Sequence, residues 1–457
     1  MGACVGAVVF AVAISGLSPE TYTLRTEDPV WDVALEDVDG DGTHDVIAFC
    51  VETDSDPPKK YLALFLSGGT HRYGATPSLR ITLGPEFGTA FTAEVDGQPP
   101  REIVVASHSK AIVYRYEEET MKVVGETTFA SILPSGSREP AFLKDAVSDL
   151  DGDGVDEWLI PVPMGCEIRR MDGLVRPVPC DVRGEMSVFG GRAVYYRLPT
   201  HRTFDVPEQS EKAIAFLTRD YIDFVYGAQW AERTRIRIPG TRSDEWETNV
   251  LMEDIDGNGL PDLVITRSRG TVNLSTRTEI YLAKKAYSFS STPDSVIETK
   301  GALTLPTLAD VNGDGRLDIV FTGFPINVRS ILNYFMRKKI TIRLEVHLFE
   351  SGGYAAKSTY RRNFLADVPE GREQVAFTAG DFDGDGIRDA AFGRSGEELA
   401  IYLGDAQDFL SRSPSLVLDM PAFGVARHKD LDNNGREDIV MFHPAGEHDK
   451  RIEVILF

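Results

Sequence analysis

The chain has 457 residues, and its 71 Asp and Glu residues outnumber its 48 Lys and Arg residues, giving a formal net charge of −23 at pH 7. This acidity argues against nucleic acid as a partner, because contacts to phosphate need clustered cations. With 42% hydrophobic residues the chain can bury a sizeable core, and its length suits either two or three domains or one array of repeats. The one notable basic cluster, residues 337–339, is expected on a solvated strand or hairpin face.

The first element is an apolar N-terminal stretch. Residues 1–16 are mostly apolar and small, with an apolar run over residues 5–13. The stretch is too short to span a bilayer and resembles the core of a secretory signal, although no Lys or Arg precedes the apolar run. The alternative is a buried first strand. We therefore expect a signal peptide over residues 1–18, one domain over residues 19–457 without a membrane span, and a secreted, periplasmic or cell-surface location.

Acidic nine-residue segments recur along the rest of the chain. The clearest, residues 381–389, reads Asp-Phe-Asp-Gly-Asp-Gly-Ile-Arg-Asp, and five more copies begin at Asp37, Asp149, Asp254, Asp310 and Asp430. Oxygens at positions 1, 3 and 5 and the backbone carbonyl at position 7 can converge on one point, and the glycine at position 6 allows the sharp turn. Without a cation the carboxylates would repel one another strongly. The spacing therefore predicts calcium sites.

Two details refine this prediction. An EF-hand needs a bidentate Glu at position 12, but that position is Phe392 in the clearest copy and is apolar in the other five. A seventh copy, residues 94–102, lacks the glycine at position 6 and the acid at position 5, so we expect that it has lost its metal site.

The six intact segments hold 23 acidic residues, which leaves 48 to balance the 48 cations, so the net charge is largely that of the loops.

The spacing of the segments predicts a β-propeller. Most of them start 49 to 71 residues apart, which suits one four-stranded antiparallel blade per repeat. A parallel β-helix is the main competitor, but its repeats lie closer together in sequence. Strands are expected after the loops at residues 61–66, 111–116, 278–282, 343–349 and 399–403, and before the last loop at 415–418.

The step between Asp149 and Asp254 is nearly two repeats long. It holds three strand-like segments without an acidic loop, residues 213–218, 221–226 and 234–238. These segments form either an extra blade or an insertion. We favour an all-β propeller of seven blades, with insertions near 161–245 and 325–345, over one of eight blades.

Cysteine placement allows one disulfide. Cys166 and Cys180 bracket a segment of hairpin length, and in an oxidising compartment they could close a loop, with a stabilisation of roughly 3 kcal/mol. Cys50 lies in an apolar strand and is expected to be a buried free thiol.

The six in-frame copies of this motif, each followed by strand residues, resemble the FG-GAP/VCBS repeat family, which includes the propeller head of integrin alpha subunits. The resemblance covers nearly all of the chain after the first 18 residues and implies a calcium-loaded propeller in which each loop joins two strands of a blade. It implies ligands at positions 1, 3, 5 and 9 and at the backbone carbonyl of position 7, with weaker binding where Asn replaces Asp. The residues concerned are Asp37, Asp39, Asp41, Thr43, Asp45, Asp149, Asp151, Asp153, Val155, Glu157, Asp254, Asp256, Asn258, Leu260, Asp262, Asp310, Asn312, Asp314, Arg316, Asp318, Asp381, Asp383, Asp385, Ile387, Asp389, Asp430, Asp432, Asn434, Arg436 and Asp438.

Function is less constrained than fold, because propellers carry unrelated activities. The chain has no G-x-S-x-G, H-E-x-x-H or P-loop motif, so we assign no catalytic residue and favour a non-catalytic module that binds an extracellular protein or glycan. A calcium-dependent polysaccharide lyase is one alternative, but no spacing singles out a base for it. A structural cell-surface protein is the other.

Overall fold

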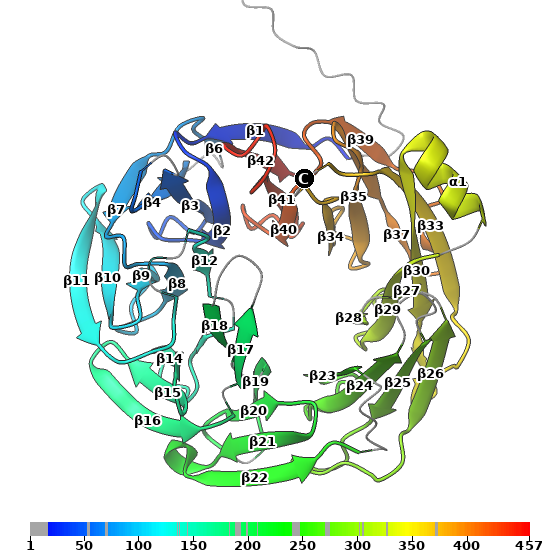
Figure 1. The fold of residues 1–457 in the computed structure, drawn as a ribbon, viewed down its shortest axis with the longest axis horizontal. Helices are drawn as coiled ribbons and strands as arrows, with labels where there is room; N and C mark the ends of the chain where they lie inside the picture. The colour runs from blue at the N-terminus through cyan, green and yellow to red at the C-terminus, as the bar shows by residue number, and fades with distance from the viewer. Residues whose placement is uncertain are drawn as a thin grey trace, which may run out of the picture.

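The chain forms a closed ring of antiparallel sheets in the computed structural model (Figure 1). Within its described residues, eight sheets of four or five strands follow one another around the ring as blades. The structure describes residues 17–52, 55–68, 72–134, 136, 138–143, 145–181, 183–187, 193–197, 200–207, 209–239, 247–269, 275–300, 302–303, 306–325, 328–370 and 373–457.

Blades 1 to 4 come from the first half of the chain, and each runs from an inner to an outer strand (Figure 1). Blade 2 carries a fifth strand, which pairs in parallel with its innermost strand. The strands are β2 (Val30–Glu36), β3 (Asp45–Glu52), β4 (Lys59–Phe65) and β7 (Leu79–Leu83) in blade 1; β8 (Thr89–Ala93), β9 (Glu102–Ala106), β10 (Lys110–Glu117), β11 (Thr120–Thr128) and β12 (Ala141–Phe142) in blade 2; β13 (Val147–Ser148), β14 (Glu157–Val162), β15 (Gly165–Arg170) and β16 (Gly173–Pro179) in blade 3; and β19 (Thr200–Phe204), β20 (Ala213–Leu217), β21 (Tyr221–Tyr226) and β22 (Glu232–Arg237) in blade 4.

Blades 5 to 8 repeat this order. The strands are β23 (Glu247–Glu253), β24 (Asp262–Arg269), β25 (Ser275–Tyr281) and β26 (Ser295–Lys300) in blade 5; β27 (Ala302–Leu303), β28 (Thr307–Ala309), β29 (Asp318–Phe324), β30 (Lys339–His347) and β33 (Tyr360–Asp367) in blade 6; β34 (Phe377–Gly380), β35 (Asp389–Ser395), β36 (Glu398–Tyr402) and β39 (Leu416–Asp419) in blade 7; and β40 (Val425–Lys429), β41 (Asp438–Phe442), β42 (Arg451–Leu456) and β1 (Glu20–Arg25) in blade 8.

The expectation of seven blades with a large insertion is wrong, because the three strands that lack an acidic loop form a blade of their own. They are β20, β21 and β22, and β19 completes the sheet as its inner strand. The connection between β19 and β20 does not contain the acidic motif. Counting acidic loops therefore undercounts the blades.

The second strands of several blades are buried along almost their whole length. Strands β3, β9 and β41 have no exposed residue, and their sequences are near-continuous apolar runs. A middle strand is covered on both faces by the neighbouring blades, so both of its sides must be apolar. For example, Phe91 of blade 2 and Trp158 of blade 3 meet edge to face, with ring centroids 5.4 Å apart. The core therefore lies between blades.

The ring is closed by its first strand. Strand β1 pairs antiparallel with β42 and forms the outer edge of blade 8, with Glu20 opposite Leu456 and Arg25 opposite Arg451 (Figure 1). Leu24 is fully buried in the core between blades 8 and 1, and the Thr23 hydroxyl donates to a Glu453 carboxylate oxygen at 2.7 Å. Both ends of the described chain therefore belong to one blade.

Short elements extend from the blades. Helix α1 (Val328–Arg337) lies on the rim between β29 and β30, so Arg337 ends a helix and does not lie on the strand or hairpin face expected from the sequence (Figure 1). Among the described residues, no helix is long and apolar enough to cross a membrane. The others are η1 (Ala228–Trp230) and the hairpins of β5 (Ser67–Gly68) with β6 (Arg72–Tyr73), β17 (Arg183–Ser187) with β18 (Ala193–Arg197), β31 (Phe349–Glu350) with β32 (Gly353–Tyr354), and β37 (Gly404–Asp405) with β38 (Phe409–Leu410).

The cysteines in the described part of the chain are free thiols. Cys166 and Cys180 are buried in the same apolar cluster, without the disulfide that their spacing allows. Cys50 is buried in blade 1 as expected, and burial raises its pKa to about 12. A thiol with so high a pKa is a poor nucleophile at neutral pH.

Candidate metal centres

All seven copies of the acidic segment occupy the same place in a blade. Each connects the innermost strand to the second strand, and position 9 is always the first residue of the second strand. Because every blade has the same up-and-down strand order, these connections emerge on one face of the ring. The sequence repeat therefore becomes a circle of acidic loops, interrupted at blade 4.

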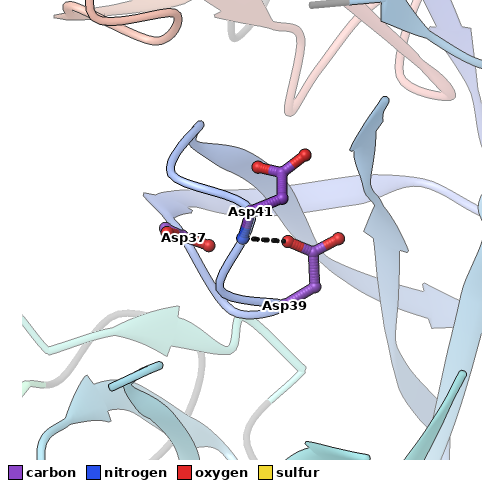
Figure 2. Close-up of side chains that lie close together, drawn as sticks. All are labelled: Asp37, Asp39 and Asp41. Carbon is purple, nitrogen blue, oxygen red and sulfur yellow. Dashed lines mark hydrogen bonds between the residues drawn. The ribbon is translucent and has the colours of Figure 1, made fainter. Parts of the chain in front are cut away.

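The loop of blade 1 shows the local geometry. Side-chain oxygens of Asp37, Asp39 and Asp41 all lie within 4.8 Å of one another. Figure 2 shows these side chains on one tight loop, with the Asp41 backbone N–H donating to Asp39 Oδ1 at 3.1 Å. Asp37 accepts the N–H groups of Gly40 and Gly42 at 2.7 and 3.0 Å. Local backbone donors thus hold the carboxylates of positions 1 and 3 in place.

The other predicted ligands form the same loop. In each of the six intact copies, the side-chain oxygen of position 5 accepts the backbone N–H of position 7, at 2.8 to 3.0 Å. Position 1 accepts the N–H of position 6 in all six, at 2.8 to 3.0 Å. Clusters of three acidic side chains also form at Asp254, Asp256 and Asp262, at Asp149, Asp151 and Glu157, at Glu94, Asp96 and Glu102, and at Asp381, Asp383 and Asp385.

Position 9 is held from two sides. Asp45 accepts the Val38 N–H at 2.9 Å and, at 2.8 Å, the N–H of Ser67, which lies just after the third strand. Asp262, Asp318, Asp389 and Asp438 accept the corresponding pair of bonds. Burial raises the pKa of Asp45, Asp389 and Asp438 to about 7, and that of Asp262 and Asp318 to about 6, against the lowering effect of these bonds.

The third-strand donors are the site residues that sequence reasoning missed. They are distant in sequence from the loops, so the motif contains no trace of them. One signal does exist, because each donor directly follows a leucine that ends the third strand or lies one residue beyond it. The donors are Ser67, Ala283, Phe349, Gly404 and Phe457, and the leucines are Leu66, Leu282, Leu348, Leu403 and Leu456.

The donor chemistry fits a hard cation. The loops offer carboxylate and amide oxygens and backbone carbonyls, which calcium prefers over nitrogen or sulfur ligands. The two position-5 asparagines also present oxygen to the loop: the Asn258 amide N–H donates to the Ala283 carbonyl at 3.0 Å, and that of Asn434 to the Phe457 carbonyl at 2.8 Å. Each amide oxygen accepts the N–H of position 7, as an aspartate oxygen does in the other loops.

Several neighbouring loops are hydrogen-bonded to each other. The backbone N–H of position 8 in one loop donates to the carbonyl of position 1 or 2 in the preceding loop around the ring. These bonds join His44 to Leu431 at 2.8 Å, Asp156 to Glu94 at 2.8 Å, Leu317 to Ile255 at 2.9 Å and Glu437 to Asp381 at 2.7 Å. A cation that orders one loop therefore also supports the next blade.

The glycine at position 6 of each intact loop adopts a left-handed backbone conformation. Gly386, at position 6, has a φ of +84°, and a Cβ placed there would meet no atom within 4 Å. We expect Gly386→Ala to destabilise the fold by about 1–2 kcal/mol through backbone strain alone. Chemical denaturation measures this cost. Gly396→Ala is the matched control, because Gly396 has an ordinary φ and loose surroundings; equal midpoints for the two variants would contradict the expectation.

Two of the acidic loops lie in a segment that matches a known protein family. Residues 228–321 match the family model of the FG-GAP-like repeat, a stretch that includes the loops of blades 5 and 6. No curated protein matches the chain. Similar solved structures include BBS1N in complex with ARL6DN (10% identity, 98% of this chain and 95% of that one, TM-score 0.38), the Vibrio cholerae biofilm matrix protein Bap1 (12%, 97% and 90%, 0.33) and the WD40 domain of SCAP from fission yeast (9%, 98% and 98%, 0.41).

Proposed function

Because the chain is a β-propeller in which residues 228–321 match the FG-GAP-like repeat, we propose that it is an exported, calcium-stabilised, non-catalytic module that binds an extracellular protein or glycan. The proposal depends chiefly on the placement of the acidic loops. They share one face, and the four backbone hydrogen bonds named above tie neighbouring loops together, so cations bound there would hold blades in position. Bound calcium would supply charge neutralisation and a fixed loop geometry.

Export is consistent with this use of calcium. Extracellular calcium-binding modules work with dissociation constants of about 10⁻⁴ to 10⁻³ M, so loops that include Asn ligands can still be occupied outside the cell. The apolar N-terminal stretch of the sequence also favours export. We place partner recognition on the face opposite the loops or on the rim, where side chains vary from blade to blade.

A binding screen tests this function. The full chain is applied to immobilised glycans, acidic polysaccharides and extracellular-matrix proteins, in calcium, in EGTA and in EGTA followed by excess calcium. We expect retention that is lost in EGTA and regained with calcium, without unsaturated sugar products. Magnesium in place of calcium serves as the control for a general ionic effect.

Two outcomes would contradict the proposal. Unsaturated products would show a lyase, because only elimination creates that double bond. Absence of retention on both glycans and proteins, with the chain folded and loaded with calcium, would leave a structural role in its place.

A further inference from the structure

In each blade that has an acidic loop, the strand register places one residue, near the end of the third strand or one position beyond it, opposite that loop. This facing residue follows the strand partner of loop position 10; in blade 1, for example, Val46 pairs with Phe65 and the facing residue is Leu66. The same register places leucine there in blades 5, 6, 7 and 8. In blades 2 and 3 the facing residues are Arg115 and Arg170. Seven loops therefore fall into two classes, five that face leucine and two that face arginine.

Arg170 reaches into the acidic cluster of blade 3. Its guanidinium donates from Nη1 to Asp153 at 2.9 Å, from Nη2 to Asp151 at 2.8 Å and from Nε to Glu157 at 2.5 Å. These acids are positions 3, 5 and 9, three of the four side chains expected to hold a metal. A guanidinium is permanently charged and presents several donors in a rigid plane, so it can neutralise several carboxylates together.

Blade 2 repeats the arrangement. Arg115 donates from Nε to Glu102 at 2.6 Å and from Nη2 to Asp96 at 2.6 Å, which are loop positions 9 and 3. This loop has Pro99 at position 6, so it lacks the N–H that anchors position 1 in the intact loops. The sequence predicts that this loop has lost its metal site. In the structure, Arg115 contacts two of its acidic side chains.

The two loops that face arginine also differ from the other five at position 9. Position 9 is Glu in blades 2 and 3 and Asp in the five leucine-facing loops. In those five, the aspartate takes one bond from position 2 and one from the residue after the leucine. In the other two, the glutamate keeps the bond from position 2, at 3.1 Å for Glu102 and 2.7 Å for Glu157, and the arginine replaces the second donor. The facing residue and the residue at position 9 thus differ together between the two classes of loop.

Blade 6 shows that an arginine near a loop is not enough. Arg316 is position 7 of its own loop, and its side chain contacts Asp314 alone among the loop acids, at 2.9 Å. It leaves Asp310 and Asp318 to their backbone donors. Among the described residues, Arg170 alone bonds to positions 3, 5 and 9 of one loop.

We propose that Arg170 is the built-in cation of the blade 3 loop, so that this loop, despite its complete motif, takes no calcium and the chain binds five calcium ions at saturation. The inference rests on the proposed calcium binding of the other loops. Calcium in blade 3 would have to displace three charge-assisted hydrogen bonds and would lie against a fixed positive charge.

Counting bound calcium tests the inference. Isothermal titration calorimetry and native mass spectrometry are applied to the full chain after chelator treatment, up to saturating calcium. We expect five ions for the unchanged chain and six for Arg170→Leu, which restores the facing residue of the other loops. Arg115→Leu is the matched control: it removes the equivalent arginine from a loop with Pro99 at position 6, so the count stays at five.

The outcomes separate the two proposals. Six ions in the unchanged chain, or five in Arg170→Leu, would overturn the role of Arg170 and leave calcium binding intact. No bound calcium in any variant would overturn the proposed function itself. If Arg170→Leu does not fold, the double variant Arg170→Leu with Glu157→Asp reproduces the leucine and aspartate pair, and circular dichroism verifies its fold before counting.

Discussion

We expect that removing calcium with EGTA lowers the midpoint of thermal unfolding by about 7–14 °C. Binding to the folded state alone stabilises it by about 1.4 kcal/mol per site at ten times the dissociation constant and about 2.7 kcal/mol at one hundred times. Five sites then contribute about 7–13 kcal/mol. The unfolding entropy of a 457-residue chain is about 1 kcal/mol per kelvin, which converts that stabilisation into the stated shift.

Differential scanning calorimetry in calcium, in EGTA and in magnesium measures the shift. The Asp385→Asn variant is a graded control, because Asn already occupies position 5 in blades 5 and 8 and fits the loop there. It should lose up to about one fifth of the calcium effect and keep its fold. Superimposed melting curves with and without EGTA would contradict calcium binding by these loops.

Deleting residues 17–25 opens the ring. The loss of β1 removes six strand pairs with β42 and exposes the edge of a strand whose last five residues are buried. An exposed apolar edge invites pairing with another chain. We expect the midpoint of unfolding to fall by at least 10 °C and the protein to aggregate at micromolar concentration, as measured by light scattering and size-exclusion chromatography.

A point substitution tests whether the buried side chain of β1, and not only the backbone pairing of this strand, stabilises the ring. Leu24 is fully buried, so Leu24→Ala should cost about 3–5 kcal/mol by creating a cavity in the core between blades 8 and 1. Thr21→Ala, on the exposed side of the same strand, should change the stability by less than about 0.5 kcal/mol. Equal stabilities of the two variants would mean that β1 does not close the ring in solution.

The propeller architecture could be predicted from the sequence because its signal is local and repeated. Each acidic segment carries its own turn glycine, its acids and the following apolar strand within a dozen residues. Blade 4 lacks this signal, so its strands were recognised but not counted as a blade. The blade count depends on which strand pairs with which, and β19 was not among the strand-like segments.

The loops themselves were predicted in part. Positions 1, 3 and 5 gather because backbone bonds within the same nine residues hold them. The third-strand donors and Arg170 could not be found in this way, because their approach depends on strand register across a hairpin. The loop of blade 3 matches the full motif for the same reason: the sequence of residues 149–157 does not indicate that the guanidinium of Arg170 contacts these acids.

The pairing of β1 with β42 also bears on how the chain folds as it is synthesised. Thr23 and Glu453 meet across a separation of 430 residues, so β1 is synthesised long before β42 and stays unpaired until β42 has been made. Closing so long a loop is entropically costly, and contacts of this kind form slowly. Until then the seven complete blades form an open arc. Closure of the ring therefore requires β42, and a chain that stops before residue 451 retains an unpaired β1.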